Sequence, residues 1–254
     1  MLLLVALGPA CGDSEPDRPR NPAEGAVERA QRSLDERRAG RIEFALTASV
    51  DEGSPVGFEI EGKYEFDGEK ELAIADLTYR QVLGEDSTET RVLSTGDDAW
   101  VVVDGDATEL SAEQTRALRV GDGGKPSAVP ALDIAEWLVD GELEEAGGRA
   151  TVTGEVDASA LVADLQVMAA QVAGTSGREL DTETAKQIDA AVEESEMTVQ
   201  TARGELRKLT AQVDFGAQVP AALRETLGSY AAARLELSMS VEDISTPLRV
   251  EAPP

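Results

Sequence analysis

The feature that most constrains this chain is a long run of alternating apolar and polar residues. Apolar side chains occupy every second position from Ile42 to Val50, a pattern typical of a β-strand with one buried face and one solvated face. Further strands, separated by short turns and mostly apolar on one face, are predicted at residues 56–67, 71–81, 87–94, 99–104 and 108–110, and the strand at 99–104 has apolar residues on both faces. Because no helical segment separates these strands, the pattern predicts an antiparallel meander and excludes a parallel sheet of the Rossmann type.

Short acidic turns separate the predicted strands. Asp67-Gly68 and Asp104-Gly105 are dipeptides that favour hairpin turns, because glycine reaches positive φ without a steric penalty. The second turn belongs to an acidic cluster that extends to Glu109 and is the best calcium candidate in the chain. It lacks the alternate ligand positions and the closing glutamate of a calcium loop. We interpret it as a turn and expect no metal site.

Helical spacing precedes and follows this meander. Asn21-Pro22 combines an N-capping residue with proline at the first helical position, and it predicts a helix that ends near Gly40. A second clear helix spans residues 158–172, with Asp157 as its cap. Shorter helices are expected at residues 111–118, 133–139 and 181–194, with a Gly- and Pro-rich loop at 120–130.

Strands return in the last part of the chain, at residues 150–156, 197–202, 205–215, 231–241 and 248–252. The order is one helix, a strand meander, several helices and then strands again. This order predicts an α+β fold in which several helices cover one face of a large antiparallel sheet.

The composition excludes several classes of function. The chain has no histidine, which rules out a Ser-His-Asp triad and every His-ligated metal site. Its one cysteine rules out intrachain disulfides and thiolate metal clusters. A net charge of −27 argues against nucleic acid as a partner. Close carboxylate pairs such as Glu144-Glu145 could act as general acid and base, but such pairs are expected by chance among 50 acidic residues. We therefore expect no enzymatic activity and no cofactor.

The N-terminus indicates export and lipid anchoring. An apolar run from Met1 to Leu7 is followed by small residues and by Cys11, the layout of a bacterial lipoprotein signal peptide that ends at its lipidation site. No basic residue precedes the apolar run, and we infer that the true start codon lies upstream. The alternatives are a plain secretion signal or an ordinary apolar terminus with a chance cysteine.

Three segments follow from this interpretation. Residues 1–11 form the signal peptide, and residues 12–22 form a polar tether that has no apolar side chain outside proline. Residues 23–254 form a single domain. No later stretch reaches 18 consecutive apolar residues, so no transmembrane helix is expected.

Three segments of the sequence resemble a known family. They are Gly57 to Tyr64, the Gly-Asp turn with its aromatic strand from Ser94 to Val101, and the ending from Leu237 to Pro253. Together they resemble the LppX/LprG-type lipoproteins of actinobacteria and, more distantly, the LolA-like lipoprotein carriers. The resemblance implies a strongly curved half-barrel whose concave face, covered by helices, encloses an apolar cavity for lipid.

The leading hypothesis is therefore a lipid-anchored protein of the cell envelope that binds or shuttles a lipid, a glycolipid or a lipoprotein acyl chain. Its partners would be that ligand, the membrane through Cys11 and an envelope transporter. The candidate cavity residues are large apolar side chains on strands and helices, although tryptophans such as Trp100 and Trp137 are more often core residues than ligand contacts. The candidates are Phe44, Leu46, Phe58, Ile60, Tyr64, Phe66, Trp100, Trp137, Leu161, Leu165 and Met168.

Two other hypotheses remain open. A scaffold or protein-interaction module of the cell envelope could use the same fold, with its helices packed tightly on the sheet and no continuous cavity. An enzyme has the least support, because the sequence shows no convergent acid, base and nucleophile.

Overall fold

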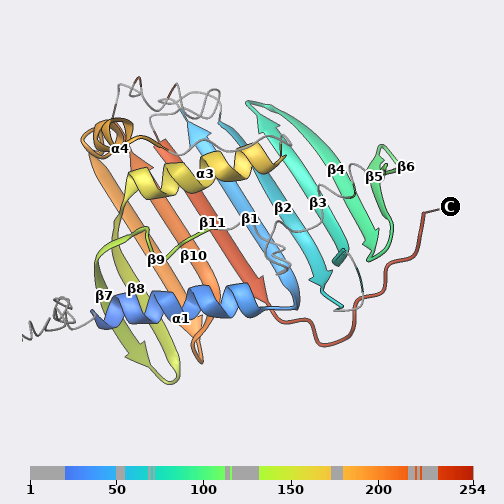
Figure 1. Ribbon diagram of the computed structural model, residues 1–254, viewed down its shortest axis with the longest axis horizontal. Coiled ribbons are helices and arrows are strands. Elements are labelled where there is room, and N and C mark those ends of the chain that lie inside the picture. Colours follow the sequence, from blue (N-terminus) through green and yellow to red (C-terminus); the bar gives the residue numbers. More distant parts are fainter. Residues whose placement is uncertain are drawn as a thin grey trace, which may run out of the picture.

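One antiparallel sheet of eleven strands organises the chain (Figure 1). The computed structural model describes residues 21–49, 55–67, 70, 72–111, 115, 132–172, 180–216, 221, 224 and 234–253. The strand order is β6-β5-β4-β3-β2-β1-β11-β10-β9-β8-β7. The edge strands β6 and β7 do not pair with each other, so the curved sheet is an open half-barrel. This confirms the predicted α+β fold class.

The sheet consists of two consecutive meanders. The first contains β1 (Ala39–Ser49), β2 (Val56–Glu65), β3 (Ile74–Leu83), β4 (Asp86–Thr95), β5 (Ala99–Val103) and β6 (Asp106–Glu109). The second contains β7 (Leu138–Ala146), β8 (Arg149–Val156), β9 (Glu194–Ala202), β10 (Glu205–Asp214) and β11 (Arg234–Glu242). Asp104-Gly105 forms the β5–β6 turn, with positive φ at both residues, as the hairpin interpretation of the acidic cluster requires.

The first and last strands join the two meanders. β1 pairs with β11 along its length, from Arg41 opposite Glu242 to Ser49 opposite Arg234. Phe44 lies opposite Met239 and both are buried, so the apolar faces of the two strands coincide. The alternation that predicts each strand therefore also fixes their register.

Three helices of the described chain lie on one face of the sheet, which we call the inner face (Figure 1). They are α1 (Pro22–Glu36), α3 (Ala158–Val172) and α4 (Thr182–Asp189). α1 crosses the sheet near one end of the strands, and α3 crosses nearer the other end (Figure 1). No helix among the described residues is long and apolar enough to cross a membrane.

α1 begins as its sequence predicts. The Asn21 side chain accepts a hydrogen bond from the Ala23 N–H at 3.0 Å, and Pro22 occupies the first helical position. The buried stripe consists mainly of small residues, and α1 contacts β7, β8 and β10. On β7, Gly141 permits a close approach, because a Cβ there would lie 3.0 Å from the Cβ of Ala23.

Two of the expected elements differ in the structure. Residues 133–139 do not form a helix: residues 134–137 are a turn, and β7 begins at Leu138. β7 is an edge strand with mostly exposed, acidic side chains, so it lacks the alternation that marks the other strands. Glu144-Glu145, the close carboxylate pair noted in the sequence, lies in this strand. Residues 248–252 form no strand, and the Leu248 N–H donates to a Glu65 carboxylate oxygen at 2.6 Å.

Helix ends also differ from the predictions. α1 ends at Glu36 and not at Gly40, because Arg37 adopts an extended backbone and β1 begins at Ala39. α4 ends at Asp189, and residue 194 already belongs to β9. Most of the predicted helix at 111–118, and the whole of the predicted loop at 120–130, lie outside the described residues.

The two tryptophans provide a direct test of the packing. Trp137 has no exposed surface, whereas Trp100 is only partly buried. We expect Trp137→Ala to lower the free energy of unfolding by about 3–5 kcal/mol, the usual effect of removing a buried tryptophan. Trp100→Ala, the matched control, should lower it by less than half as much. Equal losses in urea unfolding of the two variants would contradict the packing described here.

Candidate functional site

The inner face of β1 and β2 carries the aromatic candidates. In the β1–β2 register Phe44 lies opposite Ile60, and Leu46 lies opposite Phe58. The Phe44 and Phe58 rings stack with centroids 5.6 Å apart, and Phe58 stacks on Tyr79 of β3 at 5.8 Å. These contacts form an aromatic row across three strands on the helix-bearing side.

The apolar row continues toward β5. Leu77 on β3, Val92 on β4 and Val101 on β5 follow one another in register, and Tyr79 lies two residues from Leu77 on the same face. These four side chains are partly buried, and β4 to β6 lie beyond the three helices (Figure 1). We call the whole set the apolar inner surface. It consists of Phe58, Ile60, Leu77, Tyr79, Val92 and Val101.

The inner face of the second meander is filled. Residues 132–137, which we call the bridging segment, contribute the buried side chains of Leu132, Ile134 and Trp137. Figure 1 shows the chain entering β7 between α1 and α3. Leu161 and Leu165 of α3 are buried in the same core. The candidates Trp137, Leu161 and Leu165 are therefore core residues between the helices and the second meander.

Hydrogen bonds attach the bridging segment to both helices. The Ile134 N–H donates to the side-chain oxygen of Gln31 on α1 at 3.1 Å. On α3, one carboxylate oxygen of Asp164 accepts from the Asp133 N–H at 2.7 Å and from the Trp137 indole N–H at 2.9 Å. The segment thus ties α1 to α3 and pairs the indole N–H of its buried tryptophan.

Trp100 lies on the opposite face of the sheet. It pairs with Leu93, which pairs with Asp76, and Asp76 pairs with the exposed Lys63 of β2. Asp76, Leu93 and Trp100 are sequence neighbours of Leu77, Val92 and Val101, and neighbouring side chains in a strand point to opposite faces. Trp100 therefore does not line the space between helices and sheet, and the sequence-based assignment of this residue is corrected. A strand with apolar residues on both faces gives no signal for which face is covered.

The remaining candidates are placed as follows. Tyr64 and Phe66 are buried at the end of β2, with ring centroids 5.6 Å apart, beside the C-terminal end of α1. Burial raises the pKa of the Tyr64 hydroxyl, although the positive charge of Arg37 opposes this. Met168 belongs to α3, but its side chain lies outside the part of the chain that the structure describes, as does Cys11.

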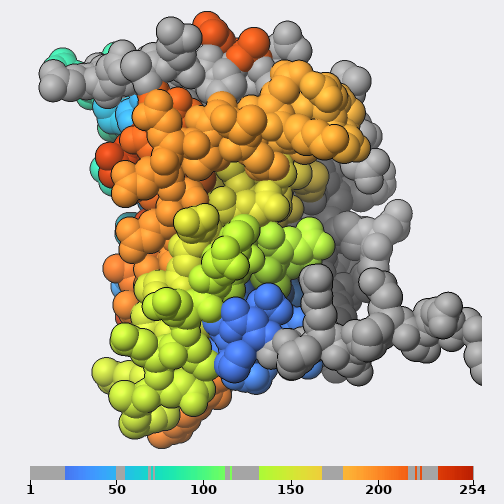
Figure 2. Space-filling model, turned by 90° about the vertical axis from the view of Figure 1, so that its left-hand side faces the viewer, coloured from blue at the N-terminus to red at the C-terminus, as the bar shows by residue number. Residues whose placement is uncertain are grey.

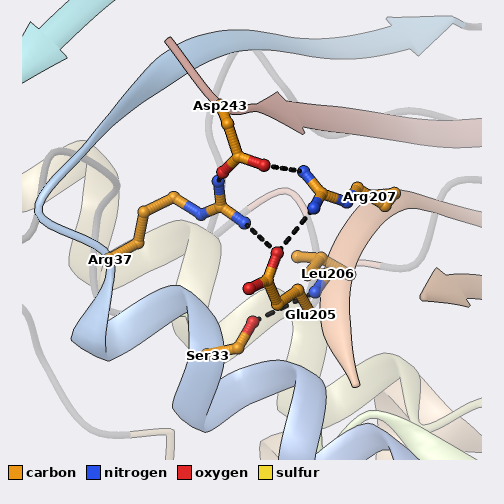
Figure 3. Close-up of polar contacts among 6 residues, drawn as sticks. All are labelled: Ser33, Arg37, Glu205, Leu206, Arg207 and Asp243. Atoms are coloured by element: carbon orange, nitrogen blue, oxygen red, sulfur yellow. Dashed lines mark hydrogen bonds and ion pairs between the residues drawn. The ribbon is translucent and has the colours of Figure 1, made fainter. Parts of the chain in front are cut away.

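An ion-pair network lies at the C-terminal end of α1 (Figure 3). The Arg37 side chain is only 7% exposed, and its guanidinium lies 3.7 Å from a Glu205 carboxylate oxygen. Arg37 and Arg207 both donate to Asp243, and Arg207 also pairs with Glu205. The hydrogen bond from Arg207, with the charge of Arg37, lowers the pKa of the Asp243 carboxyl. The network links α1 to β10 and to the end of β11.

The sequence-based list missed Leu77, Tyr79, Val92 and Val101 of the apolar inner surface. The first two occupy alternate positions in the predicted strand 71–81, so their periodicity was a usable signal. In the bridging segment the list included Trp137 but not Leu132 or Ile134, and the helix predicted at 133–139 is wrong.

Comparison with known proteins gives structural likeness only. No family model matches the chain, and no curated protein matches it. The chain is similar to the crystal structure of LprF from Mycobacterium bovis, with 9% identity, a TM-score of 0.45 and coverage of 91% of this chain and 96% of that chain. It is also similar to the LolA superfamily protein NE2245 from Nitrosomonas europaea, with 10% identity, a TM-score of 0.27 and coverage of 89% and 94%.

These two structures represent the LppX/LprG-type and LolA-like groups that the sequence resembles. At identities and TM-scores this low, the likeness concerns the fold alone.

The carboxyl group of Asp164 gives a testable pH dependence. Burial raises its pKa, and the negative charges of Asp133 and Glu136 raise it further, against the two hydrogen bonds that it accepts. The folded protein therefore holds this proton more tightly than the unfolded chain, and stability falls as the pH rises above about 4. We expect Asp164→Asn to remove this loss, so that its stability relative to wild type increases between acidic and neutral pH.

Urea unfolding at a series of pH values measures the effect of Asp164→Asn. Asp86→Asn, which changes an exposed carboxylate at the start of β4, is the control and should parallel the wild type. A wild-type advantage that grows with pH would show that the two hydrogen bonds outweigh burial.

Proposed function

We propose that this protein is a lipoprotein of the cell envelope that binds the acyl chain of a lipid, a glycolipid or another lipoprotein on its apolar inner surface. The observation that supports the proposal is the continuous row of apolar side chains on β2 to β5, partly buried on the helix-bearing face. Each methylene that such a surface removes from water contributes about 0.8 kcal/mol, so a long chain can be held by burial alone. The proposal assigns no catalytic role to any residue.

The filled side of the molecule restricts where a ligand binds. The bridging segment, whose Leu132, Ile134 and Trp137 side chains are buried, is hydrogen-bonded to Gln31 of α1 and to Asp164 of α3. An acyl chain between these helices and the second meander would have to displace fully buried side chains. The proposed site is therefore confined to the first meander, where Ile60, Leu77, Tyr79, Val92 and Val101 remain partly accessible.

Membrane attachment through Cys11 completes the proposal. The apolar N-terminal run, the single cysteine and the polar residues after it support an exported protein held at the membrane by a lipid on that thiol. An anchored carrier needs a donor or acceptor for its cargo, and we propose a transporter of the envelope in that role.

A scaffold or interaction module is the second candidate function. The bridging segment favours it, because hydrogen bonds to Gln31 and Asp164 fix a packed core where a wide cavity would otherwise extend. The two candidates differ in one respect: a scaffold has no need of accessible apolar residues on β3 to β5.

Neighbouring valines on β5 test lipid binding. Val101 faces the inner surface and Val102 faces the other side of the sheet, and both are partly buried. We expect Val101→Asn to weaken binding of a fluorescent fatty acid about tenfold or more, because it places an amide among apolar side chains. Val102→Asn, the matched control, should bind like the wild type while carrying the same change in β-propensity.

Native mass spectrometry of the gently purified protein supplements the titration. A bound lipid should be retained by wild type and by Val102→Asn and be depleted in Val101→Asn. Equal fatty-acid affinity in all three proteins, or none in the wild type, would refute the proposed site.

The anchor is tested separately, by metabolic labelling with a fatty-acid analogue. Wild-type protein should incorporate the label, and Cys11→Ser should not, since the chain has no other cysteine. The Ser variant should also leave the membrane fraction. Equal labelling of both proteins would refute lipidation at Cys11, whatever the fatty-acid titration shows.

A further inference from the structure

A pocket at one end of the sheet gathers arginines in a strongly acidic protein. It has a volume of about 520 Å³ and lies between α1 and the tips of the β7–β8 and β9–β10 hairpins. Arg29, Arg149 and Arg203 line it, with Glu145 as its one acidic lining residue. In Figure 2 the β7–β8 hairpin lies beside α1 and extends past it. We call this space the arginine pocket.

The three arginines are not used in ion pairs of the described structure. Arg37 and Arg207, by contrast, neutralise Glu205 and Asp243 in the network of Figure 3. Within the part of the chain that the structure describes, no carboxylate lies within 4.0 Å of the side-chain nitrogens of Arg29, Arg149 or Arg203. The chain has 50 acidic residues and 23 basic ones, so unpaired guanidinium groups that share a pocket run against its composition.

The backbone around the pocket is also unusual. Arg203 has a φ of 57°, in the left-handed region that glycine and asparagine tolerate and arginine rarely adopts. It is the first residue of the β9–β10 turn, and its N–H donates to the Gly148 carbonyl oxygen of the neighbouring hairpin at 2.8 Å. Arginine at this position costs backbone free energy that asparagine would avoid.

The pocket has room for a ligand. A Cβ built at Gly147, Gly148 or Gly204 would meet no heavy atom within 4 Å, so the three glycines border open space. A second pocket of about 480 Å³ adjoins the first and shares Arg29, Arg203 and Gly204 with it. The shared arginines can thus be approached from two sides.

We infer that the arginine pocket binds a phosphate group. Guanidinium groups match a tetrahedral phosphate through paired N–H donors, and three of them can neutralise a doubly charged monoester. This site lies at the opposite side of α1 from the apolar inner surface and does not depend on it. The phosphate can belong to free inorganic phosphate or to a phospholipid headgroup.

Arg203→Asn is the decisive variant. Asparagine suits the positive φ of this turn, so the variant should fold with a melting temperature equal to or above that of wild type. Its affinity for inorganic phosphate, measured through the side-chain Nε–H signals of the arginines in two-dimensional NMR, should fall about tenfold or more. Arg29→Gln should weaken phosphate binding to a similar extent.

Arg234→Gln is the matched control. Arg234 is an exposed arginine at the opposite end of β10 and β11, where it pairs with Glu236. This variant removes the same charge and should bind phosphate like the wild type. Unchanged binding in Arg203→Asn, or an equal loss in Arg234→Gln, would overturn the inference, as would a wild-type protein that does not bind phosphate or phosphatidic acid.

Vesicles distinguish the two sources of phosphate. Co-sedimentation with phosphatidylcholine vesicles that contain phosphatidic acid, lost in Arg203→Asn, would identify the site as a headgroup site. Binding of inorganic phosphate without vesicle binding would identify a site for the free anion. Inorganic phosphate has no acyl chain, so the phosphate titration and the Val101→Asn test can fail independently.

Discussion

The antiparallel pairing of β1 with β11 is the interaction on which the rest of the structure depends. It joins the first strand of the chain to the last and turns two separate meanders into one sheet of eleven strands. Without it, each meander would present a long edge strand with unpaired backbone groups. With it, the apolar faces of both meanders align, and α1, which precedes β1, can pack on strands from the second meander. Such a contact between chain ends also makes folding slow relative to local pairing.

The two meanders differ in how their inner faces are covered. The second is closed by α1, α3 and the bridging segment, with Trp137 at its centre. The first retains partly accessible apolar side chains on β3 to β5. A rigid packed half beside an apolar sheet face suits the capture of a flexible chain, since the ordered half need not rearrange when a ligand binds.

Much of the fold could be predicted because alternation is a strong local signal. All strands of the first meander, and the cap and start of α1, follow from the sequence. β7 could not, because an exposed edge strand has no buried face to impose a period of two. The candidate site was predicted in part: Phe58 and Ile60 belong to it, whereas Trp100 faces the other way, and the side chains of Leu161, Leu165 and Trp137 fill the packed half. Which face of a strand is covered depends on helices that lie far away in sequence.

The sequence by itself determined that this is an acidic α+β protein without histidine chemistry, with strands of defined polarity and a single cysteine near its start. These properties are local, since each follows from residue types and their spacing. Only the tertiary structure decided which half of the inner face is filled and which stays apolar and accessible. It also brought Arg29, Arg149 and Arg203 together from one helix and two hairpins. Contacts of that kind depend on strand order, and no periodicity along the chain encodes it.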